Sequence, residues 1–99
     1  MPSKPIHPGE ILTDELEVIE MSASDLSKAI HVPANRISQI LSGKRSISAD
    51  TALRLGKFFG TGPQFWLNLQ MSYELDSASG DNESKLADIV PLSRTAAIV

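Results

Sequence analysis

Apolar side chains recur along most of the chain at intervals of three and four residues, which is the spacing of amphipathic helices. Five segments show this period, and almost none alternates with the two-residue period of a strand. The apolar positions are Ile11, Leu12, Leu16 and Ile19; Leu26, Ala29 and Ile30; Ile37, Ile40 and Leu41; Ala52, Leu53, Leu55, Phe58 and Phe59; and Phe65, Trp66, Leu69, Tyr73 and Leu75. The pattern predicts an all-α protein.

Residues that favour helix ends separate these segments. Ser22 and Asp25 have the spacing of a capping box, and Pro33 disfavours helical geometry at Val32, so the second helix should stop near His31. The other expected boundaries are Pro8 in the first turn of the first helix, Gly43 after the third helix (34–42), Ser48 before the fourth, Gly60-Thr61-Gly62 after it, and Pro63 at the start of the fifth. About three residues therefore join the second and third helices, which is the arrangement of a helix-turn-helix.

The composition changes after Asp76. Residues 77–82 are rich in Ser, Gly and Asn, which predicts a flexible linker, and residues 83–89 have room for one short helix before Pro91. We therefore expect a helix-turn-helix domain in residues 1–76, followed by a linker and C-terminal tail in residues 77–99.

The composition also excludes several classes of function. The 99 residues include no cysteine, which excludes a disulfide scaffold, a Cys-ligated zinc site and thiol catalysis. The two histidines are too few for a three-histidine metal site within one chain. No apolar run approaches the roughly 18 residues of a membrane span, and the N-terminus lacks an apolar signal core. We identify no catalytic residue set, metal site or cofactor-binding loop, and we expect a cytoplasmic protein that is not an enzyme.

Charge is distributed unevenly along the chain. The net charge of −3 combines −5 in residues 1–25, +5 in residues 26–57 and −3 in residues 58–99. A basic middle segment between acidic flanks favours a surface that binds a polyanion. Chance clustering on a solvated surface would give the same count, so charge alone leaves both interpretations open.

The third predicted helix carries the strongest indication of function. If its three apolar side chains face inward, a rotation of 100° per residue turns Asn35, Gln39 and Ser42 outward, flanked by Arg36 and Ser38. Asn and Gln can pair with adenine through two hydrogen bonds, Arg with guanine, and Ser with several base edges or with phosphate. This face predicts base reading in a DNA major groove, and the alternative is a polar helix on an ordinary bundle.

The same region resembles a known family. Residues 24–45 are similar to the helix-turn-helix of the Cro/C1 (XRE) repressors. Three blocks, 7–12 (HPGEIL), 42–55 (SGKRSISADTALRL) and 65–70 (FWLNLQ), resemble the HigA antitoxins, also called VapI-like, in their order and spacing. The resemblance covers about residues 5–76, and residues 77–99 match the family only loosely.

This resemblance implies a five-helix, lambda-repressor-like DNA-binding domain with a short C-terminal extension. It implies a homodimer that represses its own operon by binding double-stranded operator DNA. It further implies a toxin partner of the HigB type, an mRNA-cleaving ribonuclease that the antitoxin silences. Carried over by position, base reading falls on Ala34, Asn35, Arg36, Ser38 and Gln39, and contacts to the DNA backbone fall on Lys28, Ser42, Lys44 and Arg45.

The subunit interface is expected on the last amphipathic segment. Trp66, Leu69, Tyr73 and Leu75 are candidates for a seam between subunits, although the core of a single subunit is an equal candidate. Two other functions stay open at this point. One is a stand-alone phage- or plasmid-type transcriptional regulator, and the other is a protein-interaction module without operator binding, which the negative net charge favours slightly.

Overall fold

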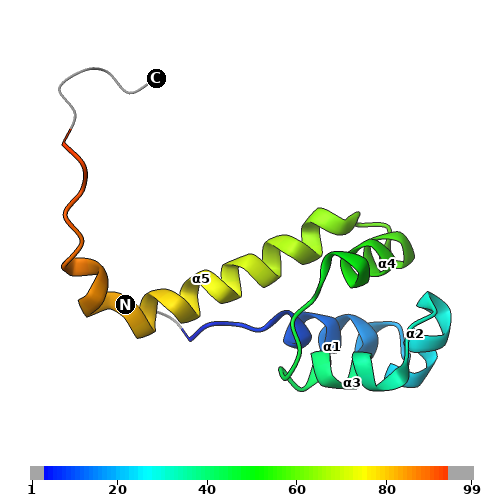
Figure 1. Ribbon diagram of the computed structural model, residues 1–99. Helices are drawn as coiled ribbons and strands as arrows, with labels where there is room; N and C mark the ends of the chain where they lie inside the picture. The colour runs from blue at the N-terminus through cyan, green and yellow to red at the C-terminus, as the bar shows by residue number, and fades with distance from the viewer. Residues whose placement is uncertain (1–3, 94–99) are drawn as a thin grey trace.

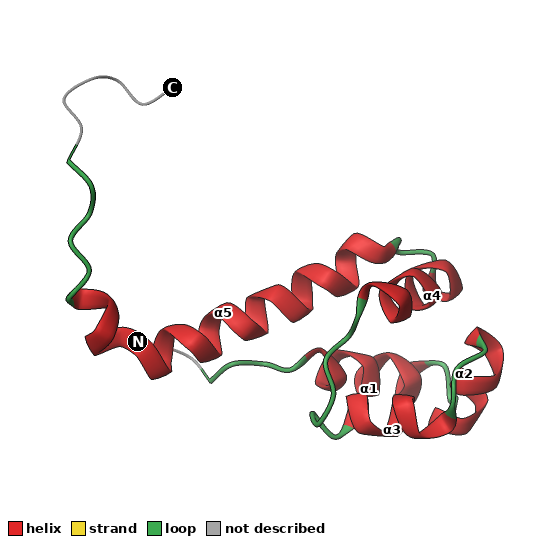
Figure 2. Cartoon of the chain, viewed as in Figure 1, coloured by secondary structure: helices red, strands yellow, loops and turns green. Residues whose placement is uncertain are grey.

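The computed structural model describes residues 4–93, and this range contains helices and loops but no strand (Figures 1 and 2). The helices are α1 (Pro8–Val18), α2 (Ala23–Ile30), α3 (Ala34–Leu41), α4 (Ala49–Phe59) and α5 (Pro63–Ala87). The predicted all-α class and the order of the helices are therefore confirmed. The end of the predicted tail, residues 94–99, lies outside the described residues. No helix of residues 4–93 combines the length and apolar character that a bilayer crossing requires.

Short-range interactions set most of the helix ends where the sequence predicted them. The Asp25 N–H donates to Ser22 Oγ at 3.0 Å, and the Ser22 N–H donates to the Asp25 carboxylate at 3.3 Å, which completes the capping box of α2. Ser48 Oγ accepts the Thr51 N–H at 3.3 Å and caps α4. Gly43 has a φ of +79° directly after α3, a left-handed conformation that glycine adopts without strain.

The His7-Pro8-Gly9 segment joins three helices. Nδ1 of His7 accepts the Gly9 N–H at 2.9 Å and caps α1, while the His7 ring meets the Tyr73 ring of α5 edge-on, with centroids 4.8 Å apart. A Cβ on Gly9 would collide with the Ile40 carbonyl, so α1 and α3 approach backbone to backbone at a position that admits no side chain. The close contact between Gly9 and Ile40 therefore fixes the position of α3 relative to the first turn of α1.

The core collects apolar side chains from all five helices. Two predicted inward positions on α4, Leu53 and Phe58, are instead exposed, and Ala29 of α2 is exposed beside them. These three side chains line an open groove between α2 and α4. The buried apolar residues are Leu12, Leu16, Leu26, Ile30, Val32, Ile37, Ile40, Ile47, Ala52, Leu55 and Trp66.

The predicted break after Asp76 is wrong, because α5 continues without interruption to Ala87. The expected linker and the expected short helix at 83–89 both belong to this helix or its C-terminal end. The segment contains one glycine, Gly80, and no proline before Pro91, and a single glycine costs only about 1 kcal/mol relative to alanine inside a helix. A helix already nucleated and docked by its first half extends through such a segment, since propagation costs far less than nucleation.

The two halves of α5 have different surroundings. The first half packs against α4 and α1, whereas the second half extends beyond the bundle (Figure 1). The molecule is accordingly elongated, with dimensions of 56 × 29 × 22 Å along its principal axes. In the bundle, α3 packs against both α1 and α2.

Candidate nucleic-acid interface

Helix α3 has one fully buried face and one polar face that is open to solvent. Ile37 and Ile40 have no exposed surface, because α1 and α2 cover them. Asn35 and Ser38, on the other side, are exposed. Burying two isoleucines is worth roughly 1.5–3 kcal/mol each, which is enough to hold this short helix in one orientation. The polar face is therefore presented on a rigid support.

The polar side chains of α3 differ in how far they are already engaged. Ser38 Oγ donates to the Asn35 carbonyl at 3.2 Å, and Ser42 Oγ donates to the Gln39 carbonyl at 3.1 Å. Gln39 is half-buried, and its Oε1 accepts the Arg45 Nε–H at 2.8 Å. The Asn35 amide makes no hydrogen bond to other residues in the range 4–93. Asn35 is thus the most accessible amide of this face.

Arg36 occupies an ion pair that the sequence analysis did not predict. Its Nη1 donates to Oδ2 of Asp50 at 3.0 Å, and the same oxygen accepts Nε–H of Arg54 at 3.1 Å. The hydrogen bond from Arg54 lowers the pKa of the Asp50 carboxyl below its ordinary value, Arg36 adds to this effect, and partial desolvation opposes it. Asp50 therefore stays ionised at neutral pH beside a predicted base-reading residue.

A basic loop follows α3, and one buried amide holds it in place. Lys44 and Arg45 are both exposed in this loop. Oε1 of Gln70, a residue of α5 with only 5% exposure, accepts the Ile47 N–H at 2.8 Å. Its Nε2 donates to Glu74 at 2.9 Å. In the sequence, Gln70 ends the block FWLNLQ, and its place in that block was the one available indication of its role.

The remaining residues predicted to contact DNA are exposed on the two helices of the motif or at their ends. Ala34 is exposed at the first turn of α3, and Ser42 is exposed at its C-terminal cap, next to the basic loop. Lys28 is exposed near the end of α2, the other helix of the motif. Pro33, which precedes α3, provides no side-chain cap, and the Arg36 N–H donates to the Pro33 carbonyl at 3.0 Å. Within residues 4–93 this leaves the N–H groups of Ala34 and Asn35 open to an anion.

The four residues named for a subunit seam or for the core differ in burial. Trp66 has no exposed surface, and its ring packs between those of Phe59 and Phe65 inside the monomer. Leu69 is half-buried against the same core. Tyr73 is half-buried, and Leu75 alone among the four is exposed. Trp66 therefore follows the alternative of a core position, because the first half of α5 docks its apolar face on α4. Periodicity does not distinguish that contact from one between subunits.

This chain is similar in sequence and structure to known helix-turn-helix proteins. The helix-turn-helix family model matches residues 20–66. A HigA-family addiction module antidote protein from Coxiella burnetii is 51% identical, with a TM-score of 0.87, over 91% of this chain and 100% of that one. Pseudomonas aeruginosa antitoxin HigA, solved with the higBA promoter, is 45% identical, with a TM-score of 0.86, over 90% of this chain and 99% of that one. This chain is therefore a helix-turn-helix protein of the XRE type.

A relative known from its sequence narrows the assignment further. Virulence-associated protein I of Dichelobacter nodosus is 49% identical over 92% of this chain and 84% of its own length. The chain belongs to the HigA (VapI-like) family, and the resemblance identified from the three sequence blocks is confirmed.

Proposed function

We propose that this protein acts in the cytoplasm as the antitoxin of a type II toxin–antitoxin module and as a sequence-specific repressor of its own operon. The observation that carries the DNA-binding part is α3, whose polar face is exposed while Ile37 and Ile40 are wholly buried behind it. The family relative from Pseudomonas aeruginosa, whose structure contains promoter DNA, supports this proposal.

The mechanism divides the contacts into two kinds. Lys28, Ser42, Lys44 and Arg45 neutralise or bond phosphates and set the position of the protein on the duplex. Base edges in the major groove are read by Ala34, Asn35, Arg36, Ser38 and Gln39, with Asn35 and Gln39 suited to adenine. Gln70 supports the first group, because it fixes the loop that carries Lys44 and Arg45.

A binding experiment tests this division. Asn35→Ala and Gln39→Ala should each cost roughly 1–3 kcal/mol on the palindromic DNA upstream of the gene and relax base choice there. Lys44→Ala should lower the affinity for operator and scrambled DNA alike. It should also reduce the slope of log affinity against log salt concentration by about one unit. Titrations in rising salt on both duplexes measure these effects. The assignment of base-reading residues fails if all three variants lose affinity equally on the two DNAs.

The homodimer in this proposal uses the exposed apolar side chains of α5 rather than Trp66. Met71, Leu75 and Leu86 are 57%, 59% and 51% exposed, and their spacing puts them within one side of the helix. Covering this stripe with a second copy would remove apolar surface from water in both subunits. A two-fold pair would place two copies of α3 about 34 Å apart, in successive major grooves.

Leu75 and Leu53 provide a matched test of this interface, since both are 59% exposed leucines on different helices. Leu75→Glu should raise the dimer dissociation constant at least about tenfold, because it places charge in an apolar seam. Leu53→Glu, on α4, should leave it unchanged. Analytical ultracentrifugation across a concentration series measures both. Dissociation by Leu53→Glu alone would place the interface on α4 instead.

Membership of the HigA family supports the toxin partner. Co-expression with the neighbouring gene tests it: a small basic ribonuclease should co-purify with this protein, and its cleavage of mRNA should stop in the complex. Operator binding without any such partner would identify a stand-alone regulator.

A further inference from the structure

Asp50 stands at the junction of three helices although it is itself largely exposed. It lies in the first turn of α4, and one carboxylate oxygen accepts hydrogen bonds from Arg36 of α3 and Arg54 of α4. Its side chain is 56% exposed, against 30% for Arg36 and 38% for Arg54. These two ion pairs are the ones formed within residues 4–93, and Asp50 belongs to both.

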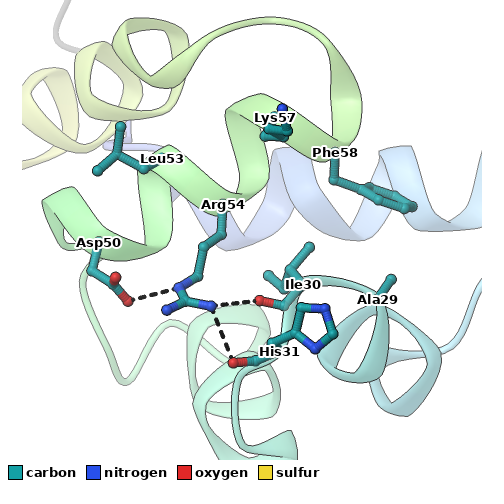
Figure 3. A pocket seen from close by; sticks show the side chains of 8 residues that line it. All are labelled: Ala29, Ile30, His31, Asp50, Leu53, Arg54, Lys57 and Phe58. Carbon is teal, nitrogen blue, oxygen red and sulfur yellow. Dashed lines mark hydrogen bonds and ion pairs between the residues drawn. The ribbon is translucent and has the colours of Figure 1, made fainter.

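The two arginines bound by Asp50 are held differently. Nη1 of Arg54 also donates to the carbonyl oxygens of Ile30 at 2.9 Å and His31 at 3.2 Å, at the C-terminal end of α2 (Figure 3). A cation at this end of a helix satisfies open carbonyls and complements the helix dipole. Arg54 is therefore anchored independently of α3. Asp50 is oriented by that anchored guanidinium, and Arg36 has this carboxylate as its one ion-pair partner.

This arrangement bears on how Arg36 meets DNA. A free arginine on a groove-facing helix attracts any phosphate, and each neutralised phosphate adds affinity that carries no sequence information. In Arg36 the Asp50 carboxylate occupies one N–H and offsets the positive charge, so this arginine attracts a phosphate less strongly than a free arginine does. Since exposed ion pairs are weak, a guanine edge that the docked helix places in line with the guanidinium can accept two hydrogen bonds from it and replace the carboxylate.

We propose that Asp50 is a specificity-determining residue, which holds the Arg36 guanidinium away from the phosphates of random DNA and releases it only at the operator. This inference rests on the proposed function, because it takes α3 as the DNA-reading helix. Asp50 does not touch DNA in this scheme. It acts through Arg36, and its effect appears in discrimination rather than in binding as such.

The test compares Asp50→Asn with Asp14→Asn on the palindromic upstream duplex and on a scrambled duplex of the same length. Asp14 is an exposed residue of α1 and a member of neither ion pair, so its substitution changes the net charge equally. Asp50→Asn should raise affinity for the scrambled duplex on the order of threefold to tenfold and steepen its salt dependence by about one unit. The ratio of operator to scrambled affinity should fall by a similar factor. Asp50→Glu, which keeps the carboxylate, should restore much of that ratio.

The Arg36→Ala background separates a role through Arg36 from a general charge effect. In the Arg36→Ala protein, adding Asp50→Asn should change neither the affinity for the operator nor that for the scrambled duplex, because no Arg36 guanidinium is present to be released. An undiminished effect of Asp50→Asn in that background overturns the inference, and so does equal behaviour of Asp50→Asn and Asp14→Asn on both duplexes. The unmodified protein provides the control for the proposed function itself. If it binds the operator and the scrambled duplex equally well, the proposed function fails; if it prefers the operator, the two outcomes above concern Asp50 alone. Unfolding midpoints of all variants establish that each is folded.

Discussion

Helix α3 and the second half of α5 are both regular helices, but different interactions hold them. Two isoleucines of α3 are completely buried, and its backbone touches Gly9 of α1. No side chain of residues 77–87 is buried, and Leu86 is 51% exposed. Packing against the rest of the chain therefore positions α3, whereas the end of α5 has only its own hydrogen bonds and its continuity with the docked first half.

This difference distinguishes a helix that its own chain supports from one whose apolar side chains its own chain leaves uncovered. Isolated helices shorter than about 12–15 residues are marginal in water, so α3 with its eight residues depends on the bundle. The bundle supplies that support within one chain, and the polar face is exposed without the help of a second chain. The end of α5 exposes an apolar stripe that a partner can cover, which agrees with a subunit interface at this position.

The largest expected contrast comes from removing one apolar side chain in each region. Ile40→Ala should lower the free energy of unfolding by about 2–5 kcal/mol at any protein concentration, since it leaves a cavity behind α3. Leu86→Ala should cost less than about 0.5 kcal/mol where the protein is dilute and monomeric. Urea unfolding at several concentrations measures both. Equal losses at the lowest concentration would mean that the end of α5 packs on its own chain.

A smaller contrast comes from two amides of α5. Gln70→Ala leaves the buried Ile47 N–H without its acceptor and should cost about 1–3 kcal/mol. Asn82→Ala should change stability by no more than about 0.5 kcal/mol, because Asn82 only donates to the Ala78 carbonyl on an exposed surface. Thermal unfolding of the two variants compares them. A large loss of stability in Asn82→Ala would show that the second half of α5 depends on more than its own helical hydrogen bonds.

The smallest expected effect concerns pH and the contact between α4 and α3. The pKa of Asp50 is lowered in the folded protein, so its ionised form stabilises the fold above the ordinary value of 3.8, and this contribution is lost as the pH falls through the lower, folded pKa. The stability difference between the unmodified protein and Asp50→Asn should therefore be present at neutral pH and shrink in strong acid. Urea midpoints measured from pH 7 to about pH 2.5 test this sign. A difference that stayed constant over that range would show that the ion pairs are not its source.

Much of the fold and of the candidate interface could be predicted because it depends on residues close together in the sequence. The capping box of Ser22 and Asp25, the left-handed Gly43 and the inward stripe of Ile37 and Ile40 each require at most one or two helical turns. The outward position of Asn35 follows from the same spacing. Local composition misled at residues 77–82, where the continuing helix outweighed a glycine and several serines.

By itself, the amino-acid sequence determined the five helices, most of their ends and the polar composition of the α3 face, since propensity, capping and periodicity act over a few residues. The C-terminal end of α5 was the exception. Tertiary structure decided which apolar side chains face the core and which stay exposed, and so buried Trp66 within the monomer while leaving Leu75 outside. It also brought together partners that lie 23 positions apart, Gln70 with Ile47 and Arg54 with His31. Such contacts depend on how whole helices pack, and no local pattern contains that information.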